Sequence, residues 1–399
     1  MAPILRRFHA NGVRPLTAGL VTALTALAIA LVPSTPLHGQ ARARARALGV
    51  PFTGAPGPLN AITDVAGVEV GHTTLVRGDG PLVVGQGPVR TGVTAVLPRG
   101  KRWAPVFAGW FAGNGFGEMT GAPWVVEGGV LGGPVMITGT YSVGAVRDAV
   151  NSWFHESLKQ EIPWHQPVVG ETSDAFLNDG QGQHVTKAHV FAALDGARTG
   201  PVPEGNVGGG TGMVAHGFKG GIGTSSRVVS GYTVGVLVQA NYGTRESLTI
   251  AGVPVGRELT GAERRRAAAP PADRDGSIIV VVATDAPLLP HQLERVARRV
   301  PMGIARLGGT ASNGSGDIFI AFSTANPGAA ASTGATQVTW LPNGDLTPLF
   351  DATVEATEEA IVNALVAGDT MTGVNGNTAY ALPHDQVRAL LRKYGRLAH

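Results

Sequence analysis

The sequence feature that most constrains this chain is an abrupt change in composition between Gly276 and Ser277. Residues 261–276 read GAERRRAAAPPADRDG and combine a charge cluster, an alanine run and a Pro-Pro pair, which predicts an exposed, flexible connection. Ser277 then begins SIIVVVATDAP, the most hydrophobic and β-branched run of the chain. Because this run is apolar on both faces, it predicts a central strand that is covered on both sides.

Strands and helices are expected on both sides of this junction. Apolar runs predict strands over the stretches 68–75, 93–97, 106–111, 135–140, 232–240 and 317–323. Spacing of apolar residues predicts helices over 143–158, 185–194, 289–300, 351–366 and 384–394. Helices and buried strands in both parts of the chain predict an α/β protein with helices outside paired sheets.

The first 41 residues resemble a secretory signal. Arg6, Arg7 and Arg14 precede the apolar stretch LTAGLVTALTALAIALV, and Gly39-Gln40-Ala41 supplies small residues for cleavage near Ala41. This order of basic, apolar and small residues is typical of an exported protein. The alternative is an uncleaved membrane anchor, because the apolar stretch approaches the minimum length for spanning a bilayer.

The net charge of +3 comes entirely from this leader. Three of the 31 basic residues lie in it, so 28 basic residues remain against 28 acidic residues. The mature chain is formally neutral, and its charge therefore gives no indication of a nucleic-acid partner.

Several kinds of active site have no support in the sequence. The chain has no cysteine, which excludes a thiolate nucleophile and a Cys-zinc site. It has no G-x-S-x-G or H-E-x-x-H motif, and His184 and His189 are five residues apart, so a metal site is unsupported. The glycine cluster 113–117 lacks the G-x-G-x-x-G spacing, the cluster 205–212 does not follow a strong strand, and dense glycine serves tight turns equally well.

Ser277 is the candidate nucleophile. If the Gly276–Ser277 bond were cut, Ser277 would carry a hydroxyl and a free α-amine, whose ordinary pKa of about 8 suits a general base. The same hydroxyl could make the cut by an N-to-O acyl shift, and Gly276 leaves its carbonyl open to attack because it has no Cβ. Composition alone leaves open a simpler interpretation, in which Ser277 merely ends a linker before a strand.

The chain resembles the DmpA-type aminopeptidases, the L-aminopeptidase/D-esterase and β-peptidyl aminopeptidase family of self-processing serine hydrolases. The resemblance covers nearly all of the mature chain and rests on several long segments in the same order. These segments are RALGVPFTGAPGPLNAITDVAGVEVGHTT (46–74), RTGVTAVLPRG (90–100), GNVGGGTGMVAHGFKGGIGTSSR (205–227), YTVGVLVQANYG (232–243), DGSIIVVVATDAPLLPHQLERVARR (275–299) and GGTASNGSGDIFIAFSTAN (308–326).

The resemblance implies a four-layer αββα sandwich, similar to the N-terminal-nucleophile hydrolases but with different connectivity. It implies self-cleavage between Gly276 and Ser277, at the end of the linker 261–276, in a chain from which the signal peptide, 1–41, has been removed. The products would be an α-chain, 42–276, and a β-chain, 277–399, of a single catalytic domain.

The resemblance also assigns catalytic roles. Ser315 and Asp317, in NGSGD, match a serine and an acid that orient the nucleophile, although NGSGD could equally be a turn before a strand. Asn241 matches an asparagine that donates to the oxyanion of the transition state. The backbone N–H groups of Gly208–Gly210 would be additional donors to that oxyanion.

Substrate binding is expected to involve three further residues. Glu171, in VVGETSDAFLND, matches an acid that binds the free amine of the substrate, Trp164 could form a wall of the same pocket, and Ser173 could widen it. The resemblance implies no metal or organic cofactor.

The function expected from these features is an exported, periplasmic or secreted serine aminopeptidase, activated by autoproteolysis, acting on short peptides or on amino-acid amides or esters. L-, D- and β-amino-acid substrates are all open. The expected assembly is a homo-oligomer of αβ pairs, without a nucleic-acid partner and without stable membrane association after signal cleavage. The alternatives are a non-catalytic binding protein on the same scaffold and a related self-processing amidohydrolase with other substrates.

Overall fold

The computed structural model describes residues 44–259, 262, 276–331 and 333–398. The predicted leader, 1–41, and nearly all of the predicted linker, 261–276, lie outside these residues. Residues Arg42–His399 form one compact unit. Within the described ranges, no helix has both the length and the apolar character needed to cross a bilayer.

The run that begins at Ser277 forms β11 (Ser277–Thr284), which lies inside a six-stranded sheet. Its neighbours are β10 (Tyr232–Asn241), which runs antiparallel, and β12 (Gly316–Ser323), which runs parallel. From edge to edge, the order of strands is β4, β3, β12, β11, β10 and β9. The prediction of a central strand is confirmed, since Ile278 to Thr284 are all buried.

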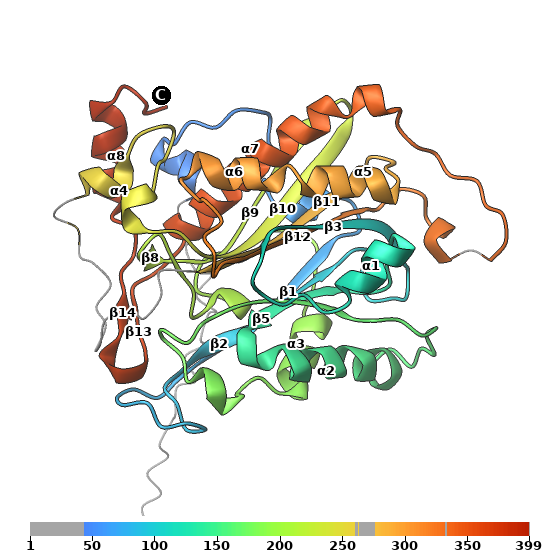
Figure 1. The fold of residues 1–399 in the computed structure, drawn as a ribbon, viewed down its shortest axis with the longest axis horizontal. Helices are drawn as coiled ribbons and strands as arrows, with labels where there is room; N and C mark the ends of the chain where they lie inside the picture. Colours follow the sequence, from blue (N-terminus) through green and yellow to red (C-terminus); the bar gives the residue numbers. More distant parts are fainter. Residues whose placement is uncertain (1–43, 260–261, 263–275, 332, 399) are drawn as a thin grey trace, which may run out of the picture. The chain divides into compact units, whose positions relative to one another are not determined.

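A second sheet has four strands in the order β1, β2, β5, β6. Helices α2 (Val143–Glu156) and α3 (Lys187–Asp195) pack on it, whereas α5 (Pro290–Ala297), α6 (Val300–Arg306) and α7 (Thr347–Val366) lie over the six-stranded sheet. Figure 1 shows these two groups of helices on the outer sides of the stacked sheets. The predicted four-layer αββα sandwich is therefore confirmed.

The remaining described strands are β1 (Glu69–Arg77), β2 (Val89–Leu97), β3 (Val106–Gly115), β4 (Val130–Leu131), β5 (Val135–Gly139), β6 (Val168–Thr172), β7 (Val214–Ala215), β8 (Phe218–Lys219), β9 (Gly221–Val229), β13 (Met371–Thr372) and β14 (Thr378–Ala379). The other described α-helices are α1 (Ala122–Gly128), α4 (Val255–Glu258) and α8 (His384–Lys393).

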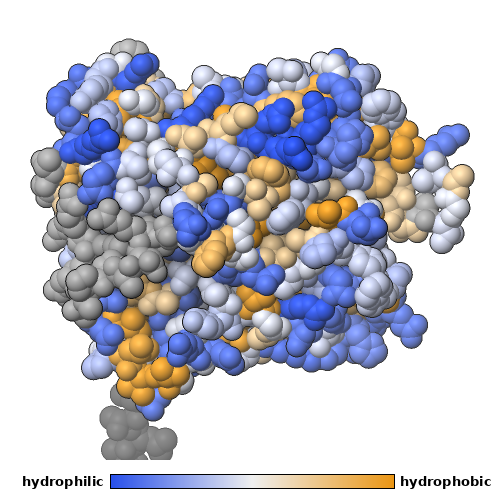
Figure 2. All heavy atoms as spheres, in the orientation of Figure 1, coloured by the Kyte–Doolittle hydropathy of each residue, from blue (hydrophilic) through white to orange (hydrophobic). Residues whose placement is uncertain are grey.

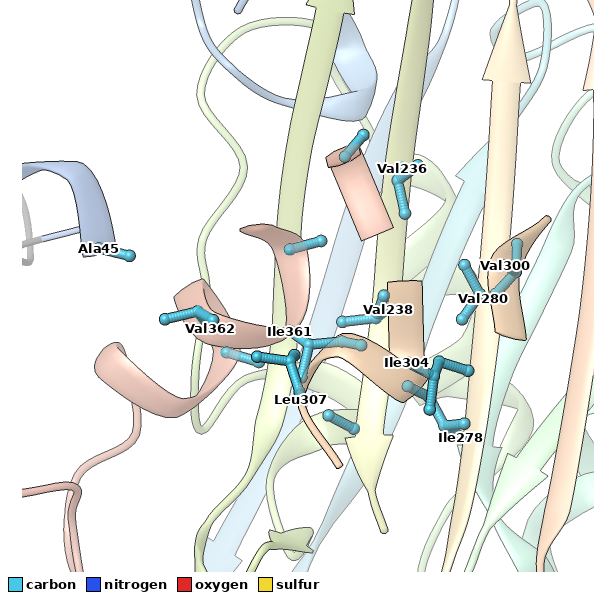
Figure 3. Packing of buried hydrophobic residues seen from close by; sticks show 14 of the residues in the cluster. Ala45, Val236, Val238, Ile278, Val280, Val300, Ile304, Leu307, Ile361 and Val362 are labelled. Atoms are coloured by element: carbon cyan, nitrogen blue, oxygen red, sulfur yellow. The ribbon is translucent and has the colours of Figure 1, made fainter. Parts of the chain in front are cut away.

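Alternate residues of β11 enter two different hydrophobic clusters. Ile278 and Val280 face helices α6 and α7, where they pack with residues such as Val238 of β10 (Figure 3). Ile279 and Val281 face the other way and pack between the two sheets. Because neighbouring side chains of a strand point to opposite faces, this central strand contributes to both clusters.

Two sequence predictions differ from the structure. The helix predicted over 289–300 is present as α5 but ends at Ala297, and a second helix, α6, begins at Val300. Pro301 lies in the first turn of α6, where a proline is tolerated because its missing N–H would have no partner within the helix. Strands β6 and β9 were not predicted, and β9 begins inside the glycine-dense stretch 205–223.

The loop between β1 and β2 exposes apolar side chains. Leu82, Val83 and Val84 are 42%, 47% and 57% exposed, and Val76 at the end of β1 is 53% exposed. Figure 2 shows hydrophobic surface at the lower left, where Figure 1 draws this loop. This loop is therefore a candidate contact surface.

A buried ion-pair network connects the N-terminal segment with α7. The carboxylate of Glu359 accepts two hydrogen bonds of 2.8 Å from the Arg46 guanidinium and also pairs at 2.8 Å with Arg227. The Asn60 amide donates to the same carboxylate at 2.6 Å. The side chains of Arg227 and Glu359 are each only 1% exposed, so both charges need compensation inside the protein, and Glu355 supplies a second carboxylate 3.5 Å from Arg227.

We expect the substitution Glu359→Gln to destabilise the protein by about 3 kcal/mol, because it removes the nearer of the two carboxylates that compensate the buried Arg227 guanidinium. Urea unfolding monitored by circular dichroism measures this loss. The matched control is Glu294→Gln, which removes an exposed ion pair with Arg298 and should cost less than about 1 kcal/mol. Equal losses for the two variants would contradict the prediction.

Candidate active site

Strand pairing brings the predicted catalytic residues to one end of β11. In the antiparallel pair Ser277 lies opposite Asn241, the last residue of β10. In the parallel pair Ile278 lies opposite Asp317, so the first residues of β11 and β12 are neighbours. The Gly316 N–H donates to the Ser277 hydroxyl at 3.1 Å.

Ser277 and Asn241 face the space between the two sheets. Strand alternation places Ser277 on the same side as Ile279, which packs between the sheets, and directly opposed residues of an antiparallel pair share a face. Asp317 lies on the other face, toward the helices, because it is opposite Ile278. Residues of the candidate site therefore lie next to Ser277 on both faces of the sheet.

The side-chain amide of Asn241 has a fixed orientation. Its Oδ1 accepts a hydrogen bond of 2.8 Å from the Val214 N–H, and the residue is only 8% exposed. Because the oxygen of the amide is engaged at Val214, its NH₂ group is directed away from that partner and can donate elsewhere. This orientation suits the predicted role of Asn241 as a donor to an oxyanion.

A buried lysine holds the peptide group that orients Asn241. The Lys219 ammonium donates to the carbonyls of Met213, Gly210 and Gly220 at 2.9, 3.1 and 2.8 Å. The C=O and N–H of a trans peptide point in opposite directions. With the Met213 carbonyl held by Lys219, the Val214 N–H of the same peptide points toward Asn241. No pattern in the sequence predicted this role of Lys219.

The predicted backbone donors of Gly208–Gly210 are engaged elsewhere, and this part of the prediction is wrong. The N–H of Gly208 donates to Thr74 Oγ1 at 2.8 Å, and that of Gly209 donates to Thr94 Oγ1 at 3.1 Å. The N–H of Gly210 donates to the Val207 carbonyl at 2.9 Å. These glycines permit close packing instead, since a Cβ on Gly209 would lie 2.1 Å from Gln239 Oε1.

Ser315 and Asp317 form a buried pair beside Ser277. The Ser315 hydroxyl donates to Asp317 Oδ1 at 2.5 Å, and each residue is 3% exposed. Burial raises the pKa of the Asp317 carboxyl, and the hydrogen bond from Ser315 partly offsets this effect. Burial, together with the nearby charge of Asp317, also raises the pKa of Tyr242. In this uncleaved chain, the described contact with the Ser277 hydroxyl comes from the Gly316 backbone between the pair.

Glu171, in β6, places a buried carboxylate close to this end of β11. Its Oε1 accepts from the Glu118 N–H at 3.0 Å, and its Oε2 accepts from the Thr140 hydroxyl. A Cβ on Gly117 would lie 3.3 Å from Glu171 Oε1 and 3.0 Å from the Cα of Gly316. Only Gly117 therefore separates the carboxylate from the residue that contacts Ser277.

The other two predicted substrate residues lie at the surface. Trp164 is 75% exposed and packs edge-to-face against Trp124 of α1, with ring centroids 4.8 Å apart. Ser173 is exposed and follows β6 directly after Thr172. Their roles in a pocket stay predictions.

Gly276 passes through a space that excludes any side chain. A Cβ at this position would lie 2.0 Å from the Asn241 carbonyl oxygen and 2.8 Å from the Cα of Tyr242. Both contacts involve backbone, which cannot move aside as the end of a flexible side chain can. The residue before Ser277 therefore has to be glycine for this path of the chain.

Asp174 is a buried carboxyl near the site, and the sequence did not predict a role for it. It accepts hydrogen bonds from the Thr91 hydroxyl at 2.5 Å and the Asn178 amide at 3.0 Å. Burial raises the pKa of the Asp174 carboxyl to about 6, and the nearby charge of Glu171 adds to the effect of burial. No local motif in the sequence distinguishes this aspartate, because its burial results from contacts between distant segments.

Comparison with known proteins gives consistent matches. Residues 60–379 match peptidase family S58. The chain is 55% identical to the β-peptidyl aminopeptidase BapA of Sphingosinicella microcystinivorans, over 92% of this chain and 98% of that protein. It is 50% identical to BapA of Sphingosinicella xenopeptidilytica, over 94% of this chain and 97% of that protein.

A solved structure extends these matches to the fold. The L-aminopeptidase D-Ala-esterase/amidase of Ochrobactrum anthropi matches with a TM-score of 0.82 and 47% identity, covering 89% of this chain and 99% of that one. That enzyme is described as a prototype of the serine aminopeptidases and as a new variant among the Ntn hydrolase fold. The predicted fold similarity is thereby confirmed.

The pKa of Asp174 predicts how stability depends on pH. The carboxyl of Asp174 has its ordinary pKa of 3.8 in the unfolded chain and a pKa of about 6 in the folded chain. Between pH 3.8 and about pH 6, the unfolded chain has therefore released a proton that the folded chain retains. Stability falls as the pH rises through this range. From pH 4 to pH 7 the wild type should lose about 2 kcal/mol of unfolding free energy relative to Asp174→Asn. Urea unfolding of both proteins measures the difference, in which the other titrating groups cancel. A difference that is independent of pH would contradict the prediction.

Proposed function

The chain belongs to peptidase family S58 and is an aminopeptidase, and on this basis we propose that it cleaves itself between Gly276 and Ser277 and then uses Ser277 as an N-terminal nucleophile. The observation that carries the proposal is the position of Ser277 at the start of a buried central strand. Its hydroxyl accepts a hydrogen bond from the Gly316 N–H, and Asn241 lies on the same face of the sheet. A strand start of this kind holds a new chain terminus rigidly.

Self-cleavage would begin with attack of Ser277 Oγ on the Gly276 carbonyl carbon. The C–N bond between the two residues breaks, the Ser277 nitrogen takes up the hydroxyl proton, and Gly276 is left as an ester on Ser277 Oγ. Water then hydrolyses the ester, which gives a Gly276 carboxylate and a free Ser277 hydroxyl. The hydrogen bond from Gly316 supports this role, since a donor to Oγ favours its developing negative charge.

Turnover would use the same hydroxyl on the first carbonyl of a substrate. The Ser277 α-amine accepts the hydroxyl proton as Oγ attacks, and passes it to the leaving amine when the scissile bond breaks. Water then releases the acyl group as a free amino acid. Asn241 would donate to the oxyanion, a role supported by the fixed orientation of its amide. None of these steps requires a cofactor.

Ser315 and Asp317 would orient the new terminus after cleavage. Their mutual hydrogen bond in the uncleaved chain keeps a hydroxyl and a carboxyl beside the position that the Ser277 amine would occupy. A carboxyl group near an ammonium favours its charged form, so this pair would help to set the pKa of the catalytic amine.

Glu171 would bind the positively charged amine of the substrate. Its carboxylate is buried and oriented by Glu118 and Thr140, which use two of its four acceptor positions. A fixed negative charge close to the nucleophile selects substrates by their free N-terminus. Trp164 and Ser173 would contribute to the outer part of this pocket.

We propose short peptides with an N-terminal β-amino acid as the preferred substrates, based on the similarity to the two β-peptidyl aminopeptidases. L- and D-amino-acid amides or esters are the competing classes. Initial rates on L-, D- and β-aminoacyl p-nitroanilides rank them, and a higher kcat/KM for an L- or D-substrate would contradict the preference.

We also propose export through the leader, 1–41, and assembly of αβ pairs into a homo-oligomer. The order of residues in the leader supports export, and the apolar loop of Leu82, Val83 and Val84 supports assembly. Cell fractionation tests export, and a protein that keeps its leader in the cytoplasm would contradict it. Light scattering of the purified protein tests assembly, and a single αβ pair in solution would contradict it.

The decisive test is the Ser277→Ala variant. Because no hydroxyl remains to attack Gly276, we expect it to stay uncut and to show no turnover of aminoacyl p-nitroanilides. Denaturing electrophoresis with N-terminal sequencing follows the cut, and the wild type should yield a fragment beginning at Ser277. A wild-type protein that stays uncut and inactive would indicate a non-catalytic relative. Normal processing of Ser277→Ala would place the nucleophile elsewhere.

For Asn241→Ala we expect kcat to fall about 100- to 1,000-fold, because one donor to the oxyanion is lost. The Michaelis constant should change little, since the oxyanion exists only in the transition state. The control Asn326→Ala removes an asparagine that bonds the backbone of Thr339 beyond the far end of β12, and it should keep its kcat. A normal kcat for Asn241→Ala would exclude the assigned role.

A further inference from the structure

Asn114, near the end of β3, gathers the backbone carbonyls of the loop that precedes β12. Its side-chain NH₂ group donates to the carbonyls of Ser312 and Asn313, each at 3.1 Å, and also to that of Ser315 at 2.5 Å. The group has only two hydrogens for three acceptors, so at least one hydrogen is shared. A single side chain thus binds three carbonyls in and just before the NGSGD segment.

A bulge in β3 directs Asn114 to this loop. In the pairing of β3 with β12, Ile318 lies opposite Ala112 and Asp317 lies opposite Asn114, which leaves Gly113 as an extra residue. In a regular strand, Asn114 would lie on the same face as Ala112, two residues earlier, which packs between the sheets. With the extra residue, Asn114 shares the face of Asp317, as expected where a bulge redirects a side chain.

The contact with Ser315 continues through one peptide group to Ser277. The carbonyl of Ser315 and the N–H of Gly316 belong to the same peptide and point in opposite directions. Asn114 holds the carbonyl on one side, and the N–H on the other side donates to Ser277 Oγ at 3.1 Å. Rotation of this peptide would break both contacts together.

We propose that Asn114 is a positioning residue that holds the Gly316 N–H against the Ser277 hydroxyl, an inference that rests on the proposed role of Ser277 as nucleophile. Asn114 does not touch the reacting atoms. Its loss removes the hydrogen bond that holds the Ser315 carbonyl, so the Gly316 N–H of the same peptide can shift and orients the Ser277 hydroxyl less well. Displacement of a reacting group by about 1 Å typically costs about 100-fold in rate.

The experiment compares Asn114→Ala with Asn114→Ser and with the control Asn326→Ala. Rates on an aminoacyl p-nitroanilide are expressed per mole of processed chain, so incomplete cleavage does not distort them. We expect Asn114→Ala to lower kcat about 10- to 100-fold and to leave KM within about twofold, since an orienting role acts on the chemical step. Asn114→Ser retains one donor and should regain part of the loss.

Thermal unfolding separates positioning from general stability. Asn326→Ala also removes an asparagine whose side chain hydrogen-bonds a loop backbone, and it should lower the melting temperature while keeping the wild-type kcat. A folded Asn114→Ala chain that does not process at all also supports the proposal, because the same hydroxyl makes the cut.

A wild-type kcat for Asn114→Ala, alongside an inactive Ser277→Ala, would overturn this inference and leave the proposed function intact. A rise in KM at unchanged kcat would overturn it as well, because the residue would then act in binding. An active Ser277→Ala enzyme would instead overturn the proposed function, and the inference would fail with it.

Discussion

The site depends on the fact that β11 pairs with an antiparallel strand on one side and with a parallel strand on the other. Because β10 is antiparallel to β11, its last residue, Asn241, lies opposite the first residue of β11. Because β12 is parallel, its own first residues lie at that same end. Two antiparallel neighbours would have placed two strand ends there, and two parallel neighbours would have placed two strand starts. The mixed arrangement brings the amide of Asn241 and the N–H of Gly316 to opposite sides of Ser277.

Two peptide groups, each held in place by a side chain, orient Asn241 and Ser277. One is held at its Met213 carbonyl by Lys219 and presents the Val214 N–H to Asn241. The other is held at its Ser315 carbonyl by Asn114 and presents the Gly316 N–H to Ser277. In both cases a side-chain donor fixes a carbonyl, and the rigid peptide plane fixes the N–H. Dipoles that are oriented before a reaction need no reorganisation during it, which is the basis of electrostatic catalysis.

The sequence predicts those parts of the protein that depend on local patterns. The apolar run after Ser277 was enough to predict β11, because burial on both faces leaves no polar alternation. Lys219 and Asn114 escaped prediction, since their partners are backbone carbonyls whose positions depend on folding. The bulge at Gly113 is likewise visible only in the register of β3 with β12. The glycines at 208–210 illustrate the opposite error, because their predicted N–H donors serve packing and not the site.

Cleavage at Gly276 would leave the interior of the fold unchanged. Strand β11 is bonded along its length to β10 and β12, and its side chains fill clusters on both faces of the sheet. The ion pairs of Glu359 with Arg46 and Arg227 join segments from the two sides of the cut. Nearly all of these contacts lie beyond the Gly276–Ser277 peptide bond, so the two chains would remain associated after its loss. The local consequence is a free amine at the one strand end where Asn241, Gly316 and Asp317 already lie in place.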